Sequence, residues 1–309
     1  MSTKKVKYVK RAIAQAITAI ENGCKPDSEL KNLILAKSGS AHLIGITGPP
    51  GVGKSTLIDS LITRIRQDNF KVGVLAVDPS SPFSGGAILG DRIRMQEHTM
   101  DNGVFIRSMS NRGYVGGVAL AAYDAIRILE AFDYDVIIIE TVGVGQSELA
   151  IAQMADTTIL TLMPGSGDDI QAIKSGIMEI ADIFLIGKGD LPGANKAATN
   201  ILQSLDLISD KPEWMPPVLI ASPLNKNGID ELWLNILKHY DFLKSTKNLE
   251  KRRKKRIACE LSELVAFNIR NSCIDSFENS IDAKSIIDEV LAKKIEPRLA
   301  ADKLLSLLK

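Results

Sequence analysis

A glycine-rich octapeptide near the start of the chain constrains the fold more than any other feature. It matches the phosphate-binding pattern G-x-x-x-x-G-K-[ST]. Residues 42–47 before it are typical of a short buried strand, and residues 56–62 after it open an amphipathic helix. Backbone N–H groups of such a loop, together with the helix N-terminus, can wrap a polyphosphate. The sequence therefore predicts binding of a nucleoside triphosphate by Gly48, Pro49, Pro50, Gly51, Val52, Gly53, Lys54, Ser55 and Thr56.

Two side chains of this loop have distinct predicted tasks. Lys54 is expected to reach the β- and γ-phosphates, and the Ser55 hydroxyl to coordinate Mg²⁺. A glycine-rich turn of no function is the alternative, and the strand and helix that flank the motif argue against it.

Composition excludes several other classes. The 309 residues are 45% hydrophobic and 24% charged, with a net charge of +1, so no overall field draws the chain to nucleic acid or to a membrane surface. Three separated cysteines and three histidines favour neither a disulfide framework nor a zinc site. No apolar stretch approaches the roughly 20 residues needed to span a bilayer. The basic first 20 residues resemble a transit peptide, but Val9, Ile13, Ala16, Ile17 and Ile20 favour an amphipathic helix, and we expect a cytoplasmic protein.

The order of predicted elements indicates an α/β fold, a P-loop NTPase with a mainly parallel sheet wrapped by helices. We expect a helical N-terminal extension over 1–40, a P-loop domain over 41–245 and a helical C-terminal arm over 246–309. The C-terminal helices have little core of their own, so we expect them to pack against a second subunit. Strands are predicted at 42–47, 72–77, 104–106, 136–139, 158–162, 183–186 and 218–220, and C-terminal helices at 250–272, 281–294 and 297–309.

Three acids are candidates for phosphate and metal chemistry. Asp78 follows the second predicted strand, where an Asx turn before Pro79 is the alternative. Asp91 follows a glycine-rich loop and could enter or leave the site as a nucleotide-sensing switch. Glu140 follows an apolar strand and precedes Gly143, at the place where P-loop enzymes hold Mg²⁺ with an acid. We expect Mg²⁺ to be bound by Ser55, Asp78, Asp91 and Glu140.

The base-reading loop of GTP-binding proteins, N-K-x-D, is represented by residues 187–190. Asp190 can accept hydrogen bonds from guanine N1–H and the N2 amine, while adenine N1 would be repelled, and the Lys188 stem can cover the ring. Gly187 replaces the asparagine that ties this loop down, which predicts weakened GTP affinity. Ser222, Pro223 and Leu224 end the last predicted strand and could contact guanine O6.

Six consecutive basic residues, 251–256, have no interleaved aromatic residue. A solvated helix face is the favoured interpretation, and an anionic partner surface is the second.

Several long segments together resemble the MeaB/ArgK family of methylmalonyl-CoA mutase-associated GTPases. They are 48–56, 77–81, 85–92, 140–148 and 164–179, with 228–233 in support, and the resemblance covers essentially the whole chain. It implies a homodimeric GTPase that acts as a chaperone for an adenosylcobalamin-dependent acyl-CoA mutase. Family members couple GTP binding and hydrolysis to cofactor loading and to protection of the mutase. By position, Lys54, Asp78, Asp91 and Glu140 would serve Mg²⁺ and phosphate chemistry.

The hydrolysis step lacks one familiar residue. Val144 stands where Ras-like proteins place a glutamine after the switch glycine, so we expect slow intrinsic hydrolysis that a partner accelerates. Lys174, Arg92 or Arg94 could supply the missing positive charge, and a surface charge is the alternative for each.

Two other functional classes stay open. A metal-insertion GTPase of the nickel or zinc type would share the fold, but it should carry a histidine-rich tract or a cysteine metal motif. A scaffold that binds nucleotide without turnover is the other alternative.

Overall fold

The computed structural model describes the chain over most of its length and divides it into two compact units, Met1–Arg256 and Ile257–Lys309. Among the helices that it describes, none combines the length and apolar character that crossing a bilayer requires. The described residues are 3–24, 26–78, 98, 100–110, 117–141, 147–165, 177–208 and 211–307.

A parallel sheet forms the core of the first unit. Its strands lie in the order β3-β2-β4-β1-β5-β6-β7, and every recorded pairing between neighbours is parallel. Each predicted strand is confirmed, with ends shifted by a few residues at most. The strands are β1 His42–Thr47, β2 Val72–Asp78, β3 Val104–Ser110, β4 Val136–Thr141, β5 Thr157–Leu162, β6 Ile183–Ile186 and β7 Val218–Ile220.

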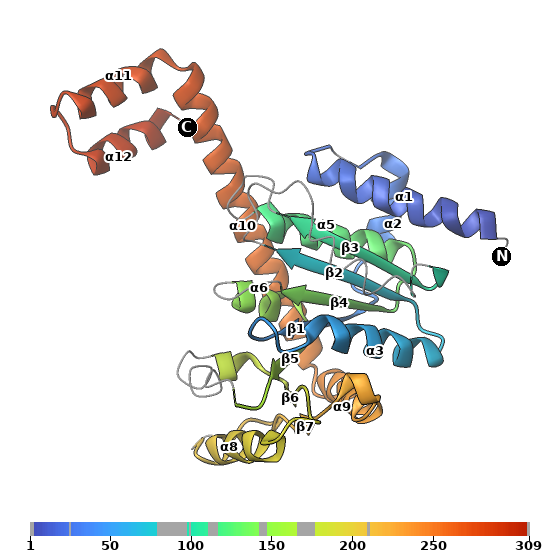
Figure 1. Cartoon of the computed structure of the whole chain (residues 1–309). Helices are drawn as coiled ribbons and strands as arrows, with labels where there is room; N and C mark the ends of the chain where they lie inside the picture. The colour runs from blue at the N-terminus through green and yellow to red at the C-terminus, as the bar shows by residue number, and fades with distance from the viewer. Residues whose placement is uncertain are drawn as a thin grey trace. The chain divides into compact units, whose positions relative to one another are not determined.

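Helices cover both faces of this sheet, which explains why its strands are apolar on both sides (Figure 1). On one face, α3 (Lys54–Gln67) and α9 (Ile229–Ser245) pack on alternate strand residues such as Ile44 and Ile46. On the other face, Leu43 belongs to a core that a second set of helices covers. These are α1 Thr3–Glu21, α5 Gly117–Ala131 and α6 Ser147–Met154, with α8 Ala194–Asp206 farther along the sheet and α2 Ser28–Lys37 packed against α5.

The N-terminal helix is amphipathic, as its sequence predicts. Ile13 and Ile17 of α1 are fully buried in the core that α5 and α6 share, and Val9, Ala16 and Ile20 pack partly buried against that core. The N-terminal helix is therefore part of the first unit.

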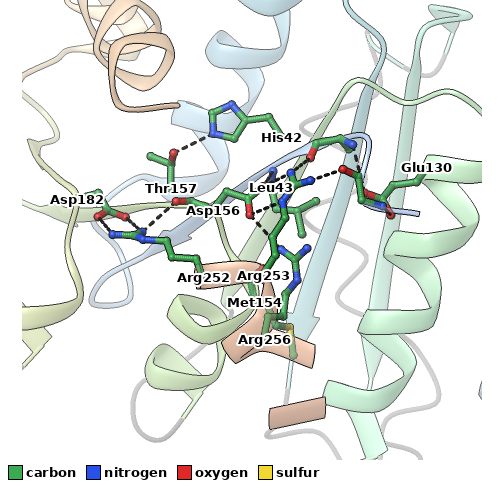
Figure 2. A network of polar contacts seen from close by, with 12 residues as sticks. His42, Leu43, Glu130, Met154, Asp156, Thr157, Asp182, Arg252, Arg253 and Arg256 are labelled. Atoms are coloured by element: carbon green, nitrogen blue, oxygen red, sulfur yellow. Dashed lines mark hydrogen bonds and ion pairs between the residues drawn. The ribbon is translucent and has the colours of Figure 1, made fainter. Parts of the chain in front are cut away.

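The basic run at the start of α10 (Asn248–Asn279) is only half solvated. Arg252 donates to both carboxylate oxygens of Asp182, at 2.8 and 2.7 Å. Arg253 and Arg256 both lie against Asp156, at 2.9 and 3.2 Å (Figure 2). The predicted solvated face is therefore wrong for the three arginines, because two buried aspartates just before β5 and β6 draw them inward. It is right for the exposed Lys251, Lys254 and Lys255.

The second unit is helical. It comprises the later part of α10 together with α11 (Ile281–Leu291) and α12 (Pro297–Leu307), which pack on each other. The Ser280 hydroxyl accepts a hydrogen bond from the backbone N–H of Ala283 at 3.3 Å and caps α11. The three predicted C-terminal helices are confirmed, although α10 continues to Asn279, beyond its predicted end at residue 272.

Candidate functional site

The glycine-rich loop joins β1 to α3 at the carboxyl edge of the sheet. Gly48 has a φ of 142°, and a Cβ there would collide with the backbone carbonyl of Thr161 on the neighbouring strand β5. Gly53 precedes the first residue of α3 with a φ of 95°. These two conformations suit glycine and expose the helix N-terminus.

The Lys54 side chain lies over the backbone of the phosphate loop. Its side chain is 7% exposed, and Nζ donates to the carbonyl oxygens of Gly48 and Pro49, at 2.7 and 3.0 Å. The ammonium is thus held above the loop backbone, where it can meet the β- and γ-phosphates of a triphosphate.

Ser55 and Glu140 meet beside this lysine. Because β1 and β4 are neighbours with Ile46 opposite Glu140, the acid at the end of β4 lies next to the first turn of α3. Ser55 Oγ donates to Glu140 Oε1 at 3.2 Å, and Glu140 is 2% exposed. A hydroxyl and a carboxylate side by side are hard oxygen donors, so this pair fits Mg²⁺.

The structure does not describe the side chains of the other two candidate acids, Asp78 and Asp91. The structure describes Asp78 as the last residue of β2, which places it at the same sheet edge, but not its side chain. Asp91 and Gly143 lie outside the described residues, as do the positions named for hydrolysis, Val144, Lys174, Arg92 and Arg94.

A cavity of about 320 Å³ opens beside the phosphate loop. It brings together residues from three segments that the sequence predicts to bind nucleotide. They are Val52, Gly53 and Thr56 from the loop and helix α3, Lys188 and Asp190 after β6, and Ser222, Pro223 and Leu224 after β7.

Asp190 and Ser222 are joined across two loops of this cavity. Ser222 Oγ donates to Asp190 Oδ1 at 2.6 Å. This hydrogen bond is the main reason that the pKa of the Asp190 carboxyl lies below its usual value, and a hydrogen bond from the Asp190 backbone N–H adds to the effect. The carboxylate is therefore held ionised and oriented, as an acceptor for two N–H donors of a base should be.

The loop with Gly187 is tied down by backbone contacts. Gly187 N donates to Leu162 O at 2.7 Å, and Gly189 N donates to Ala221 O at 2.9 Å. A Cβ on Gly187 would lie only 3.0 Å from the carbonyl oxygen of Val52 in the phosphate loop. These backbone hydrogen bonds hold the loop to β5 and to the segment after β7, without an asparagine side chain. Lys188, at a φ of 52°, extends its Nζ to 3.7 Å from Met163 Sδ.

Sequence reasoning missed several walls of the cavity. Leu57, Leu185 and Leu191 line it with Thr161, the one polar member of the group. Thr161 stands next to the last residue of β5, and a polar residue at a carboxyl strand end is the signal that could have identified it. Leu191 directly follows Asp190, so proximity to the base loop was the available sign.

The sequence matches one protein family over most of its length. A protein-family model described as "Methylmalonyl Co-A mutase-associated GTPase MeaB" matches residues 13–277. A relative from Pyrococcus abyssi is 48% identical over 299 residues, covering 96% of this chain and 92% of its own. The mouse protein "Methylmalonic aciduria type A homolog, mitochondrial" is 33% identical, covering 98% of this chain and 78% of its own.

One solved structure has a similar fold over nearly the whole chain. The crystal structure of an LAO/AO transport system kinase superposes with a TM-score of 0.70 at 27% identity, over 99% of this chain and 96% of that one. The similarity spans both the sheet and the C-terminal helices.

Proposed function

The chain belongs to the MeaB family of methylmalonyl-CoA mutase-associated GTPases, and we propose that it is the GTP-driven chaperone of an adenosylcobalamin-dependent acyl-CoA mutase. It hydrolyses GTP to GDP and phosphate. We also propose which partner and metal this reaction uses and how it is regulated.

The cavity beside the phosphate loop is the main support for binding of a guanine nucleotide. A phosphate loop with a buried lysine and a base pocket with an oriented carboxylate share one continuous cavity wall, from Val52 to Asp190. Guanine offers two adjacent donors, N1–H and the N2 amine, to such a carboxylate, whereas adenine offers an acceptor at N1. The Asp190 carboxylate therefore favours GTP over ATP.

Mg²⁺ is the proposed metal. Ser55 and Glu140 would hold it, with Asp78 and Asp91 as further proposed ligands from the sequence. Bound there, Mg²⁺ would neutralise charge on the β- and γ-phosphates during transfer. In this site, Lys54 would bind the same phosphates, while Glu140 orients the Ser55 hydroxyl by accepting a hydrogen bond from it.

Hydrolysis by the isolated chain is proposed to be slow. Val144 stands in place of the glutamine that orients the attacking water in Ras-like proteins, so a partner that reorders the switches would speed the reaction. The mutase is the proposed partner, on the strength of the family description and of the mouse relative's name.

The second unit supports a proposed homodimer. Ile257, Leu261, Val265 and Ile269 recur every four residues along α10 and are 48–57% exposed. An exposed apolar stripe of this kind marks a protein-protein contact. A second copy of the chain would bury it.

Turnover measured with and without a purified acyl-CoA mutase tests the chaperone proposal. We expect the GTP turnover number to rise when the mutase is added, with no rise when an unrelated acyl-CoA enzyme is added at the same concentration. Fast turnover that no mutase alters would contradict the proposal, and it would leave the GTPase assignment intact.

A further inference from the structure

Thr161 is a buried polar residue that has no role in the nucleotide site as proposed so far. It lies on β5 and is 1% exposed, and its Oγ1 makes no hydrogen bond with any of the residues that the structure describes. A buried hydroxyl without a partner costs stability, so such a group in a native protein calls for an explanation. Thr161 also forms part of the wall of the 320 Å³ cavity, beside the base loop.

The missing side chain of Gly187 lies against this threonine. A Cβ built on Gly187 would be 3.5 Å from Thr161 Cγ2 and 3.0 Å from the carbonyl oxygen of Val52. A longer side chain at position 187 would therefore run along the Thr161 side chain. Without it, the wall of the cavity at this point consists of backbone and the threonine alone.

The chemistry of a purine decides which of its edges would face this wall. Asp190 takes the pyrimidine edge of guanine, with N1–H and the N2 amine. The ribose leaves the opposite ring at N9 and leads to the phosphates over Lys54. N7 belongs to that same ring, so it should face the part of the cavity nearest the phosphate loop, whose lining includes Val52, Gly53 and Thr56 together with Gly187 and Thr161.

We propose that Thr161 is a further nucleotide-binding residue, whose hydroxyl donates a hydrogen bond to the N7 edge of guanine, directly or through one water molecule in the space that Gly187 leaves. N7 is an acceptor, and Thr161 is the side-chain donor of the cavity lining whose hydroxyl is buried without a hydrogen-bond partner among the described residues. Because adenine also carries N7, the contact raises purine affinity and leaves the choice of base to Asp190. The inference rests on the proposed guanine nucleotide site and explains how the site functions without an asparagine at position 187.

A chemical double-mutant cycle tests the inference. Dissociation constants are measured with Mg²⁺ for GDP and for 7-deaza-GDP, in which a C–H group replaces N7, on the full-length chain and on Thr161→Val. For the natural chain, we expect 7-deaza-GDP to bind about 5- to 10-fold more weakly than GDP, the usual effect of one lost hydrogen bond. Thr161→Val should bind GDP more weakly by a similar factor and should lose little further affinity for 7-deaza-GDP. Thr161→Ser keeps the hydroxyl and should keep the preference for GDP.

Thermal unfolding of the nucleotide-free proteins supplies an independent readout. Valine is isosteric with threonine and removes an unpaired buried hydroxyl, so Thr161→Val should unfold at the same or a higher temperature than the natural chain. Lower nucleotide affinity without lower stability is the signature of a ligand contact.

Two results would overturn the inference while leaving the proposed function in place. One is equal binding of GDP and 7-deaza-GDP by the natural chain. The other is the same loss on 7-deaza-GDP in the natural chain and in Thr161→Val. A natural chain that bound no guanine nucleotide at all would refute the proposed function first, and this inference with it.

Discussion

Arg253 Nη2 lies 2.9 Å from Asp156 Oδ2, and the aspartate is fully buried where the chain enters β5. Arg253 also donates to the carbonyl oxygen of Ala41, just before β1, at 2.8 Å. One arginine of α10, seen beside Asp156 in Figure 2, therefore holds the amino ends of two neighbouring strands. At its other end, β1 leads to the phosphate loop.

Arg253→Ala is expected to destabilise the first unit by about 3 kcal/mol, because it removes one partner of a buried charge. Arg256 still contacts Asp156, which keeps the loss near the lower end of the range for such pairs. Thermal or denaturant unfolding followed by tryptophan fluorescence measures the effect. The matched control is Lys254→Ala, one residue along and exposed, which should change stability by less than about 0.5 kcal/mol. Equal effects from the two substitutions would refute this role for Arg253.

Two buried histidines predict loss of stability in mild acid. His42 Nε2 and His239 Nδ1 lie 2.8 and 2.9 Å from the Thr157 hydroxyl. Burial lowers the pKa of His42 to about 3 and that of His239 to about 4, against the partly opposing effects of Asp156 and Asp182. The unfolded chain takes up these protons near pH 6.5. The stability that comes from keeping both rings neutral is therefore complete above pH 6.5 and is lost as the pH falls towards 4.

At pH 5, each histidine should have cost about 2 kcal/mol of stability relative to pH 7. The midpoint of thermal unfolding, measured between pH 7.5 and pH 5, gives the slope for the natural chain and for His42→Gln. The variant should show about half the decline. A decline as steep as that of the natural chain would exclude His42 as a source of the acid sensitivity.

Glu140 sets the metal requirement in this account. Because it accepts a hydrogen bond from Ser55 and is buried, Glu140→Gln should raise the Mg²⁺ concentration for half-maximal GTP turnover by about 10- to 100-fold. A Mg²⁺ titration of phosphate release measures this change. Glu231→Gln, on the exposed side of α9, serves as the control and should leave the titration unchanged. An unaltered Mg²⁺ requirement in Glu140→Gln would remove this residue from the metal site.

Local patterns in the sequence were sufficient to predict the fold. The strands are short β-branched runs between turns, so their positions follow from composition within a few residues, and the glycine-rich loop fixes which edge of the sheet holds the ligand. Ser55, Glu140, Asp190 and Ser222 were found because each lies near the carboxyl end of a strand or in the first turn of a helix, and parallel strands bring such positions together.

Residues whose roles depend on tertiary partners were not predictable in the same way. Six consecutive basic residues look alike in the sequence. Only the positions of Asp156 and Asp182 decide which of the six turn inward. Thr161 likewise carries only a weak sequence signal, a polar residue near the carboxyl end of a strand, and the cavity and the neighbouring Gly187 are needed to propose a role for it.

If the Asp190 carboxylate selects guanine, replacing it by an amide should exchange the base preference of the protein. Xanthine carries a carbonyl oxygen where guanine carries the N2 amine, so an amide at position 190 should accept xanthine and reject guanine. We predict that Asp190→Asn binds GDP on the order of 100-fold more weakly than the natural chain and binds xanthosine diphosphate more tightly than GDP. Asp206→Asn, an exposed acid at the end of α8, should keep the preference for GDP. Unchanged GDP affinity in Asp190→Asn, with no gain for xanthosine diphosphate, would show that Asp190 does not select the base.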